Sequence, residues 1–262
     1  MNHALRDDLA TVTVLARREL LRFLRQPTRL VGALMQPVVF WLLIGGGLAS
    51  TFQYATAPGV GYMQYFFPGI VVMMVLFASI FGTITVIEDR HAGFLQSVLV
   101  SPGSRTAVVV GKSLGVASVG LVQAALFLGL APTAGFGFGD IHWVPLVAFL
   151  VVGALGLSAF GFALAWLTDS TQGYHAVMSI LLLPAWVLSG AMFPPGESGG
   201  VLATLLRLNP MSYMVSGVRG ALQGDARAVP ALSGSVEGDF LWVAASAVCA
   251  IAVATYFVHK RR

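Results

Sequence analysis

The sequence predicts an all-α integral membrane protein, and three observations support that fold class. The 262-residue chain is 57% apolar and only 10% charged, whereas soluble domains carry about 25% charged residues. Its mean hydropathy is +0.83, which excludes a disordered chain because disorder needs low hydrophobicity and high net charge. Six apolar stretches are each about 20 residues long, the length that crosses the hydrocarbon core as a helix.

These six predicted transmembrane helices form one domain over residues 30–262. Their approximate limits are 30–50, 65–87, 106–131, 143–167, 174–193 and 240–258.

Residues 1–29 are predicted to form an amphipathic helix. At about 100° per residue, Arg18, Arg22 and Arg25 share one face and apolar residues share the opposite face. The apolar residues are Leu5, Leu9, Val12, Ala16, Leu20 and Phe23. Such a helix is typical of the membrane interface, with its arginines directed toward lipid phosphates, and Pro27 would end it. A solvated basic leader is the alternative. The charges throughout this segment argue against a cleaved signal peptide.

The distribution of basic residues predicts the orientation in the membrane. If both termini are cytoplasmic, 12 of the 15 Lys and Arg residues lie on the cytoplasmic side, as the positive-inside rule requires. Only Arg207, Arg219 and Arg227 fall outside. Because the basic residues sit beside apolar spans rather than in a hydrophilic patch, we do not expect nucleic acid as a partner.

Residues 88–102 connect the second and third spans on the cytoplasmic side. The segment mixes charged with apolar residues, whereas a mere linker would be more uniformly polar. Its apolar positions recur at helical spacing, which predicts a short helix with one apolar face. These positions are Phe94, Leu95, Val98 and Leu99. The face could contact a partner protein or the membrane, and the residues alone leave both uses open.

Residues 194–238 form a long external connection before the last span. It contains two apolar segments, 201–208 and 211–222, which are too short to cross a bilayer. We expect two short re-entrant helices, because irregular backbone at membrane depth needs cover from protein or water. They could border a substrate path or form an outer cap.

Several kinds of chemistry are not expected. The single cysteine, Cys249, excludes an intramolecular disulfide framework, and the histidines lack the spacing of metal ligands. The sequence Gly111-Lys112-Ser113 looks like the end of a phosphate-binding loop, but Thr106 stands where that loop needs glycine. We therefore expect no catalytic residues, no metal and no nucleotide site in this chain.

The predicted spans lack a deeply placed charge. Lys112 lies about two turns from the cytoplasmic edge, and we expect it to extend to the interface. An ion-coupled carrier would bury at least one carboxylate, so we expect the energy for any transport to come from elsewhere. An intramembrane lipid-modifying enzyme is an alternative of another class. Its nearest catalytic pair, Asp169 and His175, is six residues apart and does not share a helix face.

Three passages resemble the membrane subunit of type-2 ABC transporters, in particular the daunorubicin-resistance and polysaccharide-export permeases. The first is Tyr65-Phe66-Phe67-Pro68-Gly69-Ile70, and the second runs from Ile87 to Pro102 and continues to Arg105 and Lys112. The third is Leu208-Asn209-Pro210-Met211-Ser212-Tyr213, followed by Arg219-Gly220. The three passages occur in this order and at these spacings in the family. The resemblance covers nearly the whole chain.

This resemblance implies a permease of the bacterial cytoplasmic (inner) membrane, with a second copy of the chain and a separate ABC-type ATPase as partners, besides membrane lipid. ATP and Mg²⁺ would then bind to the ATPase. The implied coupling residues are Glu88, Asp89, Arg90, His91, Gly93, Phe94 and Leu95. The implied external motif residues are Asn209, Pro210, Tyr213 and Arg219. The run Asp89-Arg90-His91-Ala92 departs from the second glutamate that many members carry.

The expected function is ATP-driven export of an amphipathic or hydrophobic substrate such as a drug, antibiotic or lipid. Export of a lipid-linked polysaccharide is the alternative within the same family. Aromatic and methionine side chains in the spans are candidates for an apolar substrate path, with lipid-facing packing as the other interpretation. These candidates are Phe40, Trp41, Phe66, Phe67, Met73, Phe77 and Trp186.

Overall fold

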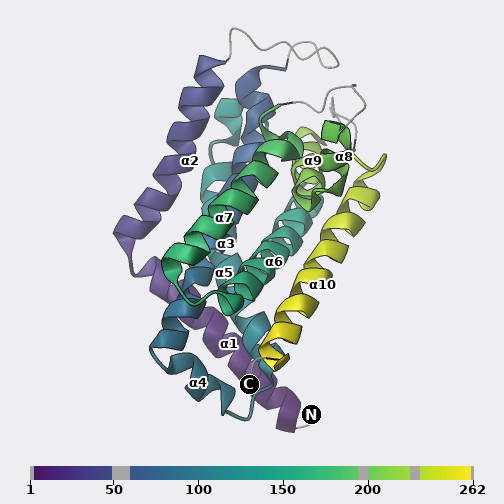
Figure 1. The fold of residues 1–262 in the computed structure, drawn as a ribbon. Helices are drawn as coiled ribbons and strands as arrows, with labels where there is room; N and C mark the ends of the chain where they lie inside the picture. Colours follow the sequence, from purple (N-terminus) through teal and green to yellow (C-terminus); the bar gives the residue numbers. More distant parts are fainter. Residues whose placement is uncertain (1–2, 49–59, 194–200, 225–230, 261–262) are drawn as a thin grey trace.

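The computed structural model describes residues 3–48, 60–193, 201–224 and 231–260, and all regular structure in them is helical (Figure 1). The longer helices are α1 (His3–Leu24), α2 (Pro27–Gly47), α3 (Tyr62–His91), α5 (Arg105–Leu128), α6 (Trp143–Leu167), α7 (Thr171–Trp186) and α10 (Val236–Lys260). The shorter ones are α4 (Phe94–Leu99), η1 (Ala131–Ala134), η2 (Val187–Ala191), α8 (Val201–Leu208) and α9 (Pro210–Gln223).

Six helices in the described residues are long and apolar enough to cross a membrane, which confirms the predicted fold class. They are α2, α3, α5, α6, α7 continued by η2, and α10. The second span is longer than predicted, because α3 begins at Tyr62 and continues through the charged residues to His91. Residues 49–50 of the first predicted span, and 194–200 and 225–230 of the external connection, lie outside the described residues.

The spans are arranged around α3, which packs against α5 and α6, while α2 and α10 stand at opposite edges (Figure 1). In α2 only 17% of the apolar 18-residue window is buried within the chain. Small residues permit close packing elsewhere: a Cβ on Gly156 of α6 would lie 3.0 Å from the Cβ of Ala247 on α10. Close approach through small residues is the usual way in which membrane helices associate.

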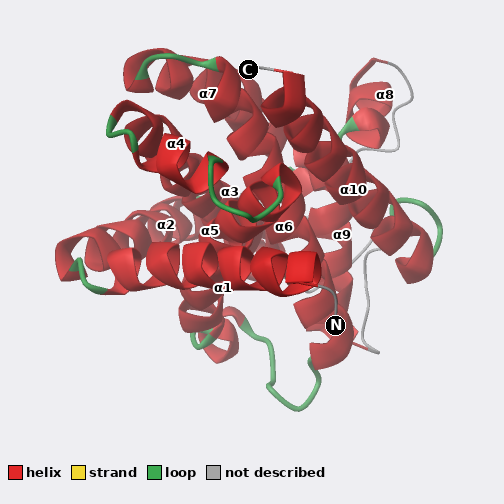
Figure 2. Cartoon of the chain, turned by 90° about the horizontal axis from the view of Figure 1, so that it is seen from below, coloured by secondary structure: helices red, strands yellow, loops and turns green. Residues whose placement is uncertain are grey.

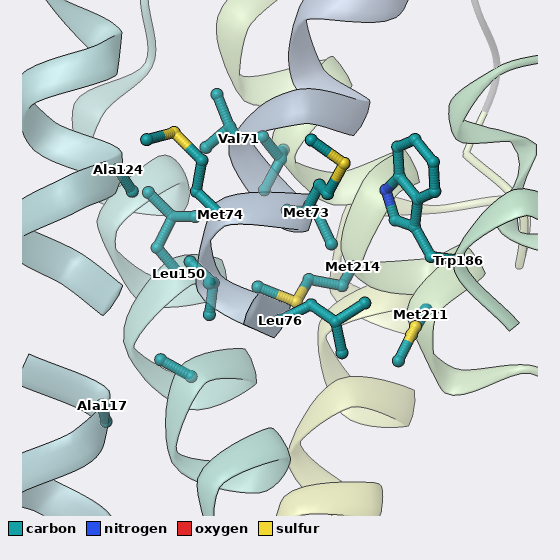
Figure 3. Close-up of a cluster of buried hydrophobic side chains, with 14 of the residues drawn as sticks. Val71, Met73, Met74, Leu76, Ala117, Ala124, Leu150, Trp186, Met211 and Met214 are labelled. Atoms are coloured by element: carbon teal, nitrogen blue, oxygen red, sulfur yellow. The ribbon is translucent and has the colours of Figure 1, made fainter. Parts of the chain in front are cut away.

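The core lies between α3 and its neighbours and is rich in methionine (Figure 3). Met73 lies on the side of α3 that carries Met211 and Met214 of α9, whereas Met74 points toward Ala124 of α5, and all four methionines are buried. Flexible thioether side chains fill irregular spaces of this kind well. The short external helix α9 is therefore an integral part of the bundle.

The N-terminal helix α1 crosses one end of the bundle, where α4 also lies (Figure 2). We call this end the α1 end, and the opposite end, which carries α8 and α9, the α9 end. The stripe of α1 that is buried against the bundle consists of Leu15, Glu19 and Phe23. It differs from the predicted apolar face, since Leu5 and Leu9 remain exposed. Because burial depends on where α5 meets the helix, amphipathic periodicity alone could not locate this stripe.

Candidate functional site

The α1 end contains a buried ionic cluster, which we define as Arg18, Glu19, Asp89 and Lys112. Lys112 of α5 is fully buried, and its Nζ lies 2.6 Å from Glu19 Oε1 of α1. The same ammonium group contacts the carboxylate of Asp89, near the end of α3. One lysine thus joins three helices that are distant in sequence.

Arg18 completes the ionic cluster from α1. Its guanidinium donates two hydrogen bonds to Asp89, at 2.7 and 2.9 Å. The hydrogen bond with Asp89 raises the pKa of Arg18 above its ordinary value, so this side chain stays charged. The guanidinium carbon also lies 4.0 Å from the centre of the Phe94 ring in α4. Arg18 therefore connects α1 both to α3 and to α4.

Close contact between α1 and α5 depends on a glycine at the ionic cluster. A Cβ on Gly115 would lie 2.7 Å from the Cβ of Glu19. Because no side chain intervenes, Glu19 can lie directly beside the α5 backbone and reach Lys112. Further out, Arg22 and Glu88 form a second contact between α1 and α3, at 2.8 Å. This exposed pair contributes little stability, since surface salt bridges are worth about 0–1 kcal/mol.

The ionic cluster corrects two sequence predictions. Lys112 does not extend to the interface, because two carboxylates bind it inside the protein. The expectation that the chain buries no charge is therefore wrong. The charges are balanced, because buried Glu19 and Asp89 meet buried Lys112 and partly exposed Arg18, and pairing of this kind is what makes buried ions tolerable.

The coupling segment forms the predicted short helix, α4, but its apolar face points inward. Leu95 is buried, and Phe94, Val98 and Leu99 pack against the core of the same chain. Leu95 is therefore not available to a partner or the membrane, whereas contact of Phe94, Val98 and Leu99, whose side chains stay partly exposed, with either one stays a prediction. The residues of this segment that remain exposed are Glu88, His91, Ala92, Gly93, Gln96, Ser97, Val100 and Pro102.

A sharp turn at Gly93 connects α3 to α4. Gly93 has φ of 75°, a left-handed conformation that glycine adopts without steric cost. The turn directs α4 back across the α1 end, so that Leu95 enters the core. Gly93 thereby sets the direction of the coupling segment.

The remaining predicted coupling residues divide into internal and external ones. Asp89 belongs to the ionic cluster and has no exposed surface to offer a partner. Arg90 donates to the carbonyl oxygens of Trp166, at 2.8 Å, and Thr168, at 2.5 Å, and lies 3.1 Å from Asp169. Arg90 thus ties α3 to the end of α6. Glu88 and His91 remain at the surface.

At the α9 end, two passages of the predicted family pattern meet at one kink. Gly190 in η2 has φ of 76°, and this breaks the helical path after α7. Its carbonyl oxygen accepts hydrogen bonds from the hydroxyl of Tyr65, at 2.8 Å, and from Arg219, at 2.9 Å. The Arg219 guanidinium also lies 4.2 Å from the centre of the Tyr65 ring. Buried Arg219 is therefore a structural residue that holds α3, η2 and α9 together.

The other external motif residues organise α9. The side chain of Asn209 caps the helix by accepting from Met211 N, at 3.0 Å, and donates to the Ala185 carbonyl, at 2.6 Å. Pro210 occupies the first turn, where a missing backbone N–H costs nothing. The Tyr213 hydroxyl donates to the carbonyl oxygen of Arg207, at 2.7 Å. These contacts determine the residue at which α9 begins, which gives the motif a structural role.

Most of the candidate substrate-path residues belong to the core instead. Trp41, Phe66, Phe67, Met73 and Trp186 are buried in the main hydrophobic cluster. Phe40 packs against the rings of Phe66 and Trp186, with both centroids at 6.1 Å. In this structure they pack within the chain, their place on a substrate path stays a prediction, and Phe77 of the predicted set borders a large cavity.

That cavity, of about 720 Å³, lies between α2 on one side and α1, α3, α5 and α7 on the other. We call it the α2 cavity. Polar residues also border it: Gln36 and Gln123, which are not among the predicted site residues, and His175. An amide inside an otherwise apolar predicted span was the signal that could have identified Gln123.

The candidate pair for an intramembrane enzyme has other contacts. Asp169 is exposed and forms its ion pair with Arg90. His175 packs against the ring of Phe81, with centroids 5.8 Å apart. These contacts give the two residues structural roles at the α1 end.

Comparison with known proteins places this geometry in a family. The family model described as "ABC-2 type transporter" matches residues 10–222, which include most of α1, the coupling segment and most of α9. The chain is 26% identical over 227 residues to the daunorubicin resistance ABC transporter permease protein DrrB1 of Streptomyces coeruleorubidus, covering 80% of this chain and 74% of that protein. It is also 26% identical over 208 residues to nodulation protein J of Rhizobium leguminosarum bv. trifolii, covering 74% of each. The chain therefore belongs to the ABC-2 type transporter family of multi-pass membrane permeases.

Proposed function

We propose that this chain is the permease subunit of an exporter that moves amphipathic or hydrophobic molecules out of the cytoplasm or its inner leaflet, driven by ATP hydrolysis on a separate subunit. The single observation that carries this proposal is the connection of α4 to α1, α3 and α5 through the ionic cluster. ATP and Mg²⁺ belong to the partner, and two permease copies pair in the inner membrane.

The α1 end is the cytoplasmic side in this proposal. The positive-inside rule assigns most basic residues to this end. The exposed apolar residues Leu5 and Leu9 of α1 suit contact with lipid at the cytoplasmic interface.

The exposed side of the coupling segment is the proposed ATPase contact. His91, Gln96, Ser97 and Val100 offer polar groups and one exposed apolar side chain. This surface is held against the spans by three residues beneath it. Asp89 and Phe94 contact Arg18, and Leu95 packs in the core. A displacement of α4 by the ATPase would then move α1, α3 and α5 together, as a rigid body.

The proposed substrate class rests on the relatives and on the α2 cavity. One relative's name refers to daunorubicin resistance. The cavity is lined mainly by apolar side chains with a few polar groups, the usual composition of a site for small amphipathic molecules.

Val100 provides a sharp test of the ATPase contact. It is 85% exposed at the α1 end, whereas Val144 is 83% exposed at the start of α6, on the opposite side of the membrane. In tagged chain extracted gently from native membranes, Val100→Asp should reduce recovery of the ATPase by about tenfold or more, because a charge enters the contact. Val144→Asp should leave recovery unchanged. Normal recovery and transport with Val100→Asp, or no ATPase with the unaltered chain, would reject the proposal.

A further inference from the structure

Arg105 is the first residue of α5, and its side chain binds the C-terminal end of α10. Its Nη1 atom donates hydrogen bonds to the carbonyl oxygens of Val258, at 3.0 Å, and His259, at 3.3 Å. The last four carbonyl groups of an α-helix have no partner within the helix, and the helix dipole also favours a cation at this end. Arg105 therefore holds the end of α10 to the start of α5.

Arg90 makes the same kind of contact on the other side of α4. It binds the carbonyl oxygens of Trp166 and Thr168 at the end of α6. Arg90 precedes α4 along the chain and Arg105 follows it. The short helix that carries the proposed ATPase contact is thus flanked by two arginines, each bound to the C-terminal end of a span that is distant in sequence.

The residues between α4 and α5 are also fixed to α1. Asp8 Oδ1 accepts a hydrogen bond from the backbone N–H of Ser104, at 2.6 Å. A Cβ on Gly103 would collide with Thr11 Oγ1, so α1 touches the chain there without a side chain in between. Because Arg105 comes directly after these contacts, a displacement of α1 or of α4 would move Arg105 as well.

The opposite end of α10 is bound to α9. The helix runs from the α9 end to the α1 end (Figure 1), and Asp239 in its first turn is fully buried. The hydroxyl of Ser216 on α9 donates to this carboxylate, at 2.6 Å. Because a helix is a stiff element, α10 connects the Arg105 contact at one end of the bundle with α9 at the other.

We propose that Arg105 is a positioning residue for the ATP-driven motion: it passes a displacement of the coupling segment to α10, and α10 passes it to α9. This inference rests on the proposed exporter function and adds to it a connection between the ATPase contact and the opposite side of the membrane. Packed helices and hydrogen bonds carry energetic coupling over such distances. The ionic cluster moves α1, α3 and α5 with the coupling segment, and Arg105 adds α10.

Three substitutions separate the two contacts of α10. Arg105→Gln removes the cation at its C-terminal end, whereas Arg105→Lys retains a cation. One nitrogen of Arg105 makes both hydrogen bonds, and an ammonium group has enough donors to replace it. Ser216→Ala removes the contact with α9. Asp239 then keeps the backbone N–H groups of Leu232 and Ser233 as donors, so its carboxylate stays hydrogen-bonded.

Hydrogen exchange read by mass spectrometry tests the connection in the complex of the full chain with its copurified ATPase, in phospholipid nanodiscs. Each complex is measured without nucleotide and with Mg²⁺ and a non-hydrolysable ATP analogue. The measured quantity is the change in deuterium uptake between these two states, in α9 and in residues 252–260 of α10. Arg17→Gln is the control, because it removes an exposed arginine from α1 at the same end of the bundle.

In the unaltered complex we expect the nucleotide to change uptake in both segments. Arg105→Gln should lose most of this change in both, because the displacement no longer reaches α10. Ser216→Ala should lose it in α9 alone. Arg105→Lys and Arg17→Gln should respond as the unaltered complex does. Recovery of the ATPase should be the same for all variants, since none of them alters the exposed surface of α4.

A residue that only stabilises the fold would behave differently, because its loss raises uptake in both states and leaves the change between them intact. That result for Arg105→Gln would overturn the inference, and so would equal losses in Arg17→Gln or an unaltered complex without a change in α9. If Arg105→Gln does not fold, an unchanged α9 response in Ser216→Ala overturns it.

The failure of this inference and the failure of the exporter proposal are distinguishable. If the ATPase is recovered and the variants give any of these contrary results, the Arg105 connection falls and the exporter proposal stands. If the unaltered chain recovers no ATPase, both fall.

Discussion

Lys112 on α5 and Glu19 on α1 form a buried ion pair, with 2.6 Å between Nζ and Oε1. The pair fixes the N-terminal helix to the third span at a point where Gly115 lets the two helices meet closely. Asp89 binds the same lysine and so adds the end of α3. The amphipathic helix is consequently part of the transmembrane bundle, rather than an independent segment beside it.

Removing the lysine should destabilise the bundle strongly. Lys112→Met leaves two buried carboxylates with Arg18 and, at 3.8 Å from Asp89, Arg22 as cations. Breaking a buried pair in this way costs about 3–5 kcal/mol. We expect a clear fall in Tm of the detergent-purified chain, measured by the loss of monodisperse protein after heating.

The double variant Lys112→Met/Glu19→Gln tests the cause of that loss. It removes one charge of each sign and leaves Arg18 with Asp89, so part of the stability should return. Lys260→Met, at the exposed end of α10, controls for loss of a lysine. If the single and double variants melt together, charge imbalance is not the cause.

The contact between α3 and the η2 kink should tolerate no additional methyl group. A Cβ on Gly69 would lie 2.7 Å from the Cβ of Ala191 and 2.9 Å from its carbonyl oxygen. Gly69→Ala should therefore cost about 1–3 kcal/mol through overpacking.

Gly47→Ala is the matched control, because a Cβ there meets no atom within 4 Å. This substitution should be neutral or slightly stabilising, since alanine favours a helix over glycine by about 1 kcal/mol. Thermal denaturation of the two variants should move Tm in different directions. Similar Tm values for both would contradict the close packing at the kink.

The left-handed turn at Gly93 should be required for the orientation of α4. Gly93→Ala imposes a side chain at φ of 75°, which costs about 1–2 kcal/mol. We expect the chain to insert and fold, but recovery of the ATPase should fall several-fold because the α4 surface is displaced. Gly139→Ala, a position with open space, should recover the ATPase normally. Full recovery with Gly93→Ala would show that the turn does not set the coupling surface.

The sequence by itself determined the six spans and the short helices between them. Span length and hydropathy are local properties, and a bilayer of fixed thickness converts them directly into helix number. The coupling helix was predictable for the same reason, since Phe94, Leu95 and Val98 show the helical period without any neighbour. Asn209 and Pro210 likewise marked the start of α9, because a capping residue acts within one turn.

Only the tertiary structure decided what these helices face. Periodicity showed that α4 has an apolar face, but the packing of α4 against α3 and α5 turned that face inward. The charges of Glu19, Asp89 and Lys112 looked separate in the sequence because the first two are 70 positions apart. Their pairing, the meeting of Tyr65 with Arg219, and the cavity around Gln123 depend on which helices are neighbours. Helix neighbours are set by side-chain packing across the whole bundle, and no local pattern contains that information.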